Sequence, residues 1–140
     1  MLVRLMYASR PTPALGAEAL SAVVRRSKAH NPAVGVTGVL CASDGFIVQL
    51  LEGGRGPVNA LYNRIAADPR HTQVELLAYD EIAERRFAGW AMGHVDVARL
   101  NPALLLKYCE QATLDPYAVS GRAALALFDE LVTTAAIVCA

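Results

Sequence analysis

The stretch FIVQLLEGG, residues 46–54, has the composition of a buried β-strand with one polar residue at its centre. Its apolar residues, several of which favour strands, are Phe46, Ile47, Val48, Leu50 and Leu51. Gln49 carries a primary amide, and burying an amide without a hydrogen-bond partner costs about 1–3 kcal/mol. Successive residues of a strand point to opposite faces, so Ile47, Gln49 and Leu51 share one face. The stretch therefore predicts a buried strand face that must supply a partner for the glutamine amide.

The flanking sequence predicts the other elements. Alternating residues predict strands over 2–9, 36–42, 45–53, 73–80 and 89–95. Helical spacing predicts helices over 15–29, 56–68, 103–112 and 122–132. Ser43-Asp44-Gly45 lies between the second and third strands and is typical of a hairpin turn.

The order of these elements predicts an α+β fold. The first six, β-α-β-β-α-β, match the ferredoxin-like pattern, which is an antiparallel sheet with two helices on one face. A fifth strand and two C-terminal helices are added to this core. We expect these two helices to cover the second face of the sheet or a partner surface.

Length and composition limit the classes of protein. A chain of 140 residues is enough for one domain with its own core. Lys plus Arg and Asp plus Glu number 13 each, and the resulting net charge of zero argues against direct binding of nucleic acid. No apolar run reaches membrane-spanning length and the start lacks a signal-peptide pattern, so we expect a cytoplasmic protein that does not bind membranes. Cys41, Cys109 and Cys139 are far apart and indicate neither a metal site nor a disulfide framework.

The three histidines do not indicate catalysis. His30 and His71 follow predicted helix ends, where an imidazolium near the last carbonyls is common, and His94 is expected at the end of a strand. The sequence contains no nucleophile elbow, phosphate-binding glycine loop or HExxH metal motif. These features argue against an enzyme.

Several polar residues are predicted to face the layer between the sheet and the first two helices. Tyr7 shares a strand face with Leu5, and we expect it to lie near Gln49, where each side chain needs a partner. A hydrogen bond between Tyr7 and Gln49 would satisfy both without any ligand. Trp90 and Met92 are predicted to share one face of the last strand.

Residues at the helix ends extend this layer. Asn31 follows the first helix, and residues 68–71 place a carboxylate, a guanidinium and an imidazole at the end of the second. Val23 and Ile65 lie on the aliphatic stripes of the two helices. Two aliphatic helices over polar strand residues could hold a flat aromatic ligand with a polar edge, and Arg and His at the mouth could meet its phosphates.

Five stretches together resemble the BLUF domain, a blue-light sensor that uses FAD. They are LMYASR (5–10), SKAHNPAVGVTGVLC (27–41), GFIVQLLEGG (45–54), VNALYNRIAADPRH (58–71) and RRFAGWAMG (85–93). The short chain is similar to stand-alone members of the family, which carry no enzymatic or DNA-binding domain. The resemblance implies a photosensor domain over residues 1–97 and a C-terminal helical extension over residues 98–140.

The resemblance also implies roles for individual residues. Tyr7 and Gln49 match the photoactive pair, and Met92 and Trp90 match two residues of the last strand, one or the other of which lies near the glutamine. The matched cofactor-binding positions are Tyr7, Val23, Ser27, His30, Asn31, Gln49, Ile65, Asp68, Arg70 and His71. Arg64 and Leu50 stand where members vary, so their roles stay open. No residue matches a metal ligand.

The mechanism implied by the resemblance begins with FAD, or FMN or riboflavin in its place, held non-covalently between the two helices. Light drives electron transfer from Tyr7 to the flavin, and proton transfer and radical recombination leave a rearranged Gln49 network, by rotation or tautomerisation of the amide. The signal then passes through the last strand and the C-terminal helices to a downstream protein, and a homodimer is one expected arrangement. The alternatives are a flavin enzyme, a flavin-binding protein without a photosensory role, and an interaction module.

Overall fold

The computed structural model describes residues 1–43 and 45–133. Asp44 of the predicted hairpin turn and residues 134–140, which include Cys139, lie outside the described residues. The strands are β1 (Leu2–Pro11), β2 (Thr37–Ala42), β3 (Ile47–Gly54), β4 (His71–Ile82) and β5 (Gly93–Asp96). The helices are α1 (Ala17–His30), α2 (Arg55–Ala67), α3 (Pro102–Tyr108) and α4 (Gly121–Thr133), with short 3-10 helices η1 (Asn31–Val34) and η2 (Val97–Arg99).

The strands form one mixed sheet in the order β4-β1-β3-β2-β5. β1 pairs antiparallel with β3 and β4, and β2 pairs antiparallel with β3. β5 is added at the β2 edge and runs parallel to β2. This is the predicted ferredoxin-like α+β arrangement with a fifth strand.

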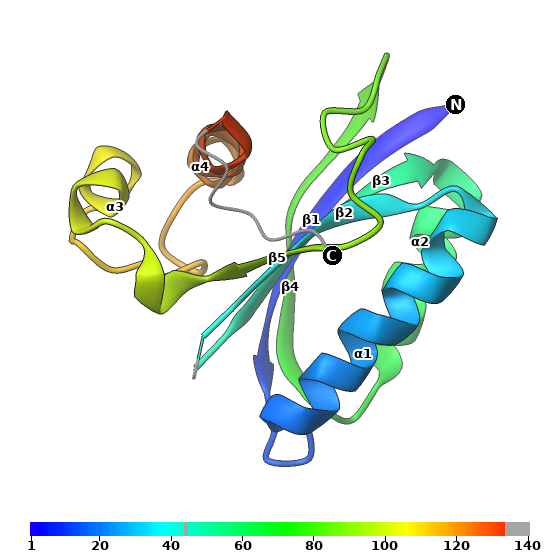
Figure 1. Ribbon diagram of the computed structural model, residues 1–140, viewed down its shortest axis with the longest axis horizontal. Coiled ribbons are helices and arrows are strands. Elements are labelled where there is room, and N and C mark those ends of the chain that lie inside the picture. The colour runs from blue at the N-terminus through cyan, green and yellow to red at the C-terminus, as the bar shows by residue number, and fades with distance from the viewer. Residues whose placement is uncertain (44, 134–140) are drawn as a thin grey trace.

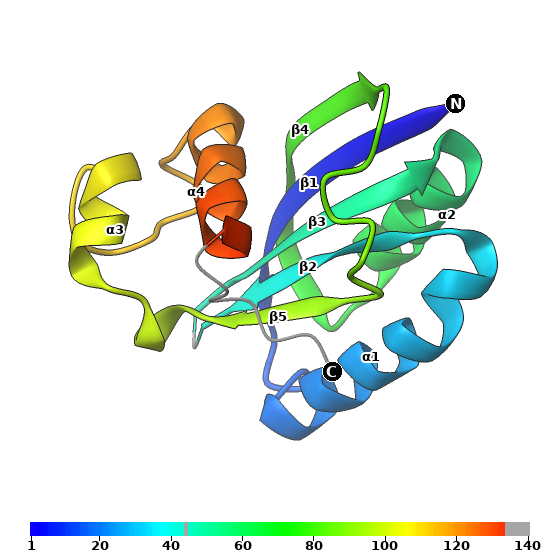
Figure 2. The same cartoon turned by 45° about the horizontal axis from the view of Figure 1, so that its top comes forward.

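Helices cover both faces of the sheet. α1 and α2 lie on one face, and α3 and α4 lie on the other (Figures 1 and 2). The α1–α2 face is built on buried residues that include Leu5, Tyr7, Ile47, Leu51 and Met92. The α3–α4 face is built on a second cluster, which includes Met6, Ala8, Val48, Leu50, Phe87 and Phe128. The described residues of α3 and α4 therefore pack against this face of the sheet.

The alternation of side chains in the central strands explains both clusters. Tyr7 and Gln49 point to the α1–α2 face, whereas the next residues, Ala8 and Val48, point to the α3–α4 face. Because β1 and β3 are covered on both faces, they are buried at almost every position.

The largest differences from the predicted boundaries are in α3, β4 and β5. α3 ends at Tyr108 rather than at residue 112, because Cys109 has an extended backbone conformation. β4 extends beyond 73–80 at both ends, since as an edge strand with much exposed surface it tolerates polar residues. β5 begins only at Gly93, so the prediction of a strand from residue 89 is wrong. Residues 83–92 form an irregular connection, in which Trp90 N donates to Phe87 O (3.1 Å) and Gly38 N donates to Trp90 O (2.9 Å).

Candidate functional site

Tyr7 and Gln49 face each other across the two central strands. They are direct partners in the β1–β3 register, and the Tyr7 hydroxyl donates to Gln49 Oε1 at 2.5 Å. Both side chains are buried. Burial raises the pKa of Tyr7 above its ordinary value of 10.0, and the neighbouring Tyr62 adds to the effect, so the phenol stays protonated at physiological pH.

The other end of the Gln49 amide contacts Met92. Gln49 Nε2 lies 3.5 Å from Met92 Sδ, and Met92 is fully buried in the cluster of the α1–α2 face. A thioether sulfur accepts a hydrogen bond weakly and has no proton to donate. The Met92 contact therefore requires the NH₂ end of the amide on that side, while the Tyr7 hydroxyl donates to the oxygen end.

Trp90 does not share this environment. It is partly buried and packs against the cluster of the α3–α4 face, on the opposite side of the sheet from Met92. The prediction that Trp90 and Met92 share one strand face is wrong, because both residues precede β5 and lie in the irregular connection. Strand alternation does not apply there, and Met92 is the residue beside the glutamine.

A cavity opens from the Tyr7–Gln49 pair between α1 and α2. Its inner part, of about 80 Å³, is bordered by Tyr7, Gln49 and Met92. Its outer part, of about 510 Å³, is bordered by Asn31, Arg64 and Asp68. The two parts share Val23, Ser27, Leu61, Ile65 and His71, so they are neighbouring sections of one space. This size falls in the ordinary range of small-molecule sites, about 300–1,000 Å³.

Asn31 presents an unpaired donor to this cavity. It is the first residue of η1, directly after α1, and it is 6% exposed. Its backbone oxygen accepts from Val36 N and Gly35 N, but its side-chain Nδ2 has no hydrogen-bond partner within the described part of the chain. A buried amide nitrogen rarely lacks an acceptor, and a ligand carbonyl at the cavity would supply one.

A group of charged residues lies at the outer end of α2. The backbone N–H of Arg70 donates to Asp68 Oδ1 at 2.9 Å. The Arg70 guanidinium also donates to the Asp68 carboxylate through Nε and through Nη2, the latter at 2.7 Å. These bonds hold the pKa of Asp68 at about 2 and raise the pKa of Arg70. Arg70 Nη1 makes none of these bonds.

His71 begins β4 and borders both parts of the cavity. Its Nδ1 lies 2.8 Å from the Oγ of Ser9, a buried residue on the same strand face as Tyr7. Burial lowers the pKa of His71, an effect that Asp68 partly opposes. The imidazole is therefore neutral at pH 7.

All the cofactor-binding positions expected from the sequence border one cavity. Val23, Ser27, His30, Asn31, Ile65, Asp68, Arg70 and His71 line it, together with Tyr7 and Gln49. Arg26, Leu61 and Ser9 were missed as site residues. Leu61 lies on the same helical stripe as Ile65, and Ser9 on the same strand face as Tyr7, so periodicity could have found both.

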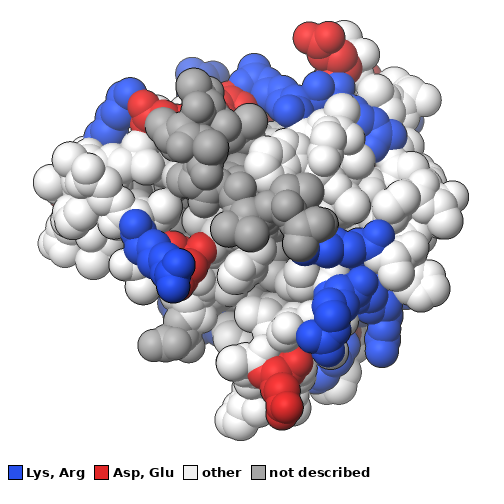
Figure 3. All heavy atoms as spheres, in the orientation of Figure 1, with Lys and Arg blue, Asp and Glu red and all other residues white. Residues whose placement is uncertain are grey.

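Lys and Arg side chains gather over α1 in Figure 3, and α1 carries Arg25, Arg26 and Lys28.

A comparison with protein families decides the identity. The model of the BLUF family, sensors of blue-light using FAD, matches residues 2–93. The chain belongs to the BLUF family. The family's cofactor is FAD, and its members sense blue light.

Curated relatives carry the BLUF sequence within much longer proteins. The chain is 33% identical over 107 residues to photoactivated adenylate cyclase subunit beta of Euglena longa and 34% identical over 107 residues to subunit alpha of Euglena gracilis. These matches cover 74% of this chain but only 12% and 10% of the cyclase subunits. The cyclase activity in these names belongs to the longer proteins. The region that matches this BLUF chain is only a small part of each of them.

Solved structures of BLUF proteins match most of the chain. The dark-state structure of BlrB, a BLUF protein, has 30% identity and a TM-score of 0.79 and covers 96% of both chains. The photo-activated state of BlsA has 28% identity and a TM-score of 0.84, over 94% of this chain and 95% of BlsA. These likenesses include the C-terminal part of the BLUF chain, since each extends beyond the share covered by the family model.

The residues present fit a flavin. An isoalloxazine ring is flat and has polar carbonyl and nitrogen edges, and the cavity combines aliphatic side chains from α1 and α2 with the unpaired Asn31 Nδ2 and the Gln49 amide. Within residues 1–43 and 45–133, no group of three or more His, Cys, Asp and Glu residues could hold a metal ion. Over the same residues, no helix is long and apolar enough to cross a membrane.

Proposed function

We propose that this BLUF protein binds flavin non-covalently between α1 and α2 and that Tyr7, Gln49 and Met92 form its light-operated switch. The observation that carries the proposal is the buried series from Tyr7 Oη through the Gln49 amide to Met92 Sδ, at the inner end of a cavity. Asn31 borders the outer part of this cavity, and its Nδ2 has no hydrogen-bond partner among the described residues. Val23 and Ile65 would flank the ring, with Ser27 and His30 near the end of α1. Asn31 would donate to the polar edge of the ring.

The Gln49 amide has the properties of a two-position switch. Its oxygen accepts from Tyr7 and its nitrogen donates to Met92. Turning the amide by half a rotation would place oxygen against a sulfur that cannot donate, so the Met92 contact would be lost. A change at the amide, whether rotation or tautomerisation, is thereby linked to the position of Met92 and of the connection that carries it.

Tyr7 is the electron and proton donor of the proposed switch. A bound flavin supplies a ring that absorbs blue light and, once excited, accepts an electron. The Tyr7 phenol is buried and protonated, and its proton already points at Gln49 Oε1. Loss of an electron from Tyr7 to the flavin would make this proton strongly acidic. The proton would then move along the existing hydrogen bond to Gln49 Oε1. Gln49 is therefore the group whose bonding changes when Tyr7 is oxidised.

The outer part of the cavity suits the phosphate end of FAD. Asp68 fixes the guanidinium of Arg70 through Nε and Nη2 and leaves Nη1 for a phosphate. Arg26 and Arg64 border the same space, so the role left open for Arg64 is a second phosphate contact. His71, neutral and fixed by Ser9, would accept or donate at the ribityl chain. This arrangement favours FAD over FMN and riboflavin, which carry fewer phosphates or none.

The output would leave through the C-terminal helices. We assign residues 1–97 to the photosensor and residues 98–140 to a helical extension that contacts a downstream protein in the cytoplasm, with a homodimer as one arrangement. Signalling through a partner needs a difference in partner affinity between the dark and lit states. Residues of the 83–92 connection support this route, since the Arg86 guanidinium pairs with Asp129 on α4.

An absorption spectrum before and after blue illumination tests the proposal. The purified protein should be yellow, should shift its flavin absorption reversibly to longer wavelength under blue light, and should return in the dark. Unfolding in guanidinium should release all of the chromophore, because no covalent attachment is proposed. A protein that takes up no flavin when FAD is supplied, or that shows no reversible shift, would contradict the proposed function.

A further inference from the structure

A buried carboxylate lies on the same strand as the switch but on the other face of the sheet. Glu52 follows Gln49 by three residues on β3, and its side chain is 0% exposed. Arg4, its partner in the β1–β3 register, donates to Glu52 Oε2 through Nε (2.9 Å) and Nη2 (2.7 Å). A buried carboxylate is costly unless it is paired, so this position is expected to serve a purpose beyond filling space.

The carboxylate also binds the backbone of the 83–92 connection. Phe87 N donates to Glu52 Oε1 at 2.8 Å, and Arg86 N donates to both oxygens, at 3.1 and 3.2 Å. Both oxygens of Glu52 are thus engaged, one mainly by the guanidinium of Arg4 and the other by two successive backbone N–H groups. These are charge-assisted hydrogen bonds to a buried carboxylate, and such bonds are stronger than neutral ones.

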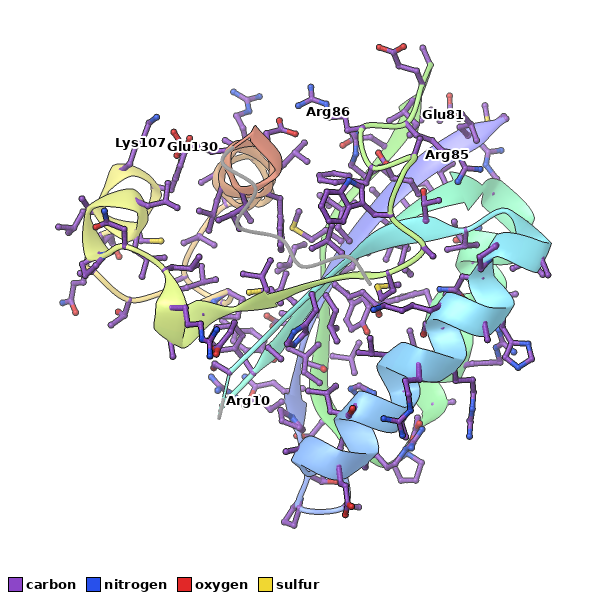
Figure 4. The ribbon with its side chains drawn as sticks, in the orientation of Figure 1. Arg10, Glu81, Arg85, Arg86, Lys107 and Glu130 are labelled. Atoms are coloured by element: carbon purple, nitrogen blue, oxygen red, sulfur yellow. The ribbon has the colours of Figure 1, made fainter. Side chains whose placement is uncertain are left out.

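Arg85 adds a second attachment beside the first. Its guanidinium donates to Thr37 Oγ1 (3.0 Å), to Glu52 O (3.2 Å) and to Gly35 O (2.6 Å). Figure 4 shows Arg85 and Arg86 extending in different directions from the connection, Arg86 toward α4. The start of the connection is therefore fixed to β2, to β3 and to the turn before β2, in which Gly35 adopts a left-handed conformation (φ 71°).

Residues 86–92 then pass from one face of the sheet to the other. Phe87 is fully buried in the cluster of the α3–α4 face, whereas Met92, five residues later, is buried in the cluster of the α1–α2 face. Between them, Gly38 N holds Trp90 O at 2.9 Å. Side chains of β3 thus form hydrogen bonds to both ends of this short segment, Glu52 at residues 86–87 and Gln49 at Met92.

We propose that Glu52 is a positioning residue for the photosensory switch: its carboxylate fixes the start of the 86–92 segment and so keeps Met92 Sδ within reach of the Gln49 amide. The inference rests on the proposed function, because it assigns Glu52 to the switch formed by Tyr7, Gln49 and Met92. Without this attachment the segment would sample more conformations, and Met92 would have to be ordered again each time the dark contact forms. The return from the lit to the dark state would therefore slow.

Glu52→Gln tests the role with little change in shape. A carboxamide keeps one acceptor oxygen but brings an NH₂ group toward Arg4 or toward the backbone N–H groups, so at least one bond is lost. Leu105→Ala is the matched control, since it removes buried atoms from α3 and leaves Glu52 intact. If Glu52→Gln does not fold, Arg4→Met combined with Glu52→Met removes both charges, a kind of replacement that buried ion pairs often tolerate, and still deprives residues 86–87 of their acceptor.

Two measurements on the 140-residue protein decide the outcome. Hydrogen exchange in the dark needs no flavin, and we expect faster exchange confined to residues 86–92 in Glu52→Gln. Dark recovery after blue light should slow about fivefold relative to Leu105→Ala, the factor for ordering roughly one more backbone residue. Exchange and recovery equal to those of Leu105→Ala would overturn the inference, as would faster exchange with unchanged recovery. If the wild type takes up no flavin, the proposed function fails, while the exchange data still report whether Glu52 anchors the segment.

Discussion

Trp90 and Met92 are two residues apart in the chain, yet they pack on opposite faces of the sheet. Met92 is 1% exposed and receives the Gln49 amide at 3.5 Å, while Trp90 packs with the cluster under α3 and α4. The connection before β5 thereby touches both the proposed switch and the proposed output surface. A displacement of Met92 would therefore shift Trp90, two residues earlier, on the other face of the sheet.

Met92→Leu should impair the switch while Trp90→Phe should not. Leucine fills a similar volume but offers no acceptor to Gln49 Nε2, so the preference for one amide orientation weakens. We expect an altered dark absorption maximum or an altered recovery rate in Met92→Leu. Trp90→Phe keeps an apolar ring on the α3–α4 face and should leave the spectrum nearly unchanged. Illumination spectroscopy of both variants checks this, and the reverse pattern would place Trp90 at the switch.

Gln49→Leu should keep flavin binding and abolish the light-induced red shift. The substitution removes the amide that bonds both Tyr7 and Met92 and leaves a buried phenol without its acceptor, which costs about 1–3 kcal/mol. Tyr7→Phe should also block the normal photocycle by removing the electron and proton donor. Combining the two substitutions should restore part of the stability, since neither polar partner is then left alone. A normal reversible red shift in either single variant would refute the mechanism.

Arg70→Ala should weaken FAD binding more than riboflavin binding. Charge-assisted hydrogen bonds contribute about 1.5–3 kcal/mol, so the loss for FAD should be about tenfold or more, and riboflavin has no phosphate to lose. Arg55→Ala is the control, because Arg55 pairs with Glu81 and is not among the residues that line the cavity. Titration of apoprotein with both ligands provides the measurement. Equal losses for FAD and riboflavin would restrict Arg70 to its structural pair with Asp68.

Acidification from pH 7.5 to 5.5 should destabilise the protein through His71. Burial lowers the pKa of His71 below its ordinary value of 6.5, so the unfolded chain binds this proton more readily than the folded one. Its contribution is complete above pH 6.5 and declines as the pH falls toward the folded pKa. Asp68, with a pKa of about 2, loses its contribution only below about pH 4, outside this window.

Urea unfolding at the two pH values measures the effect, with His71→Gln as the comparison. The variant keeps an acceptor for Ser9 and has no titrating ring, so its stability should change less between pH 7.5 and 5.5 than that of the wild type. An equal change in both proteins would show that other groups set the pH dependence.

Blue light should increase hydrogen exchange in residues 90–97 and alter exchange in α4. The Arg86–Asp129 ion pair connects the 83–92 connection to α4, and Lys107 pairs with Glu130 between α3 and α4. Arg86→Ala should reduce the response of α4 and retain that of residues 90–97, whereas Lys107→Ala should leave the α4 response in place. Identical protection in the dark and under light from residue 90 to the C-terminus would reject this output route.

The sequence by itself determined the parts of this protein in which apolar and polar residues follow the period of a strand or a helix. Alternation in residues 2–9 and 46–54 placed Tyr7 and Gln49 on one buried face, and helical spacing placed Val23 and Ile65 over it. These patterns are local, because each residue's direction follows from its neighbours within a strand or helix. The motifs of the BLUF family added the cofactor, which no spacing of residues could specify.

Only the tertiary structure decided the course of the irregular connection before β5, where neither strand nor helical periodicity applies. Met92 rather than Trp90 reaches Gln49, because the segment before β5 takes its course from bonds to Gly38, Glu52 and Gln49 and not from strand pairing. Glu52 likewise reads as an ordinary strand residue until Arg4 and the backbone of residues 86–87 are brought to it from distant positions. Such positions depend on long-range hydrogen bonds, and the chain's local conformational preferences contain no information about them.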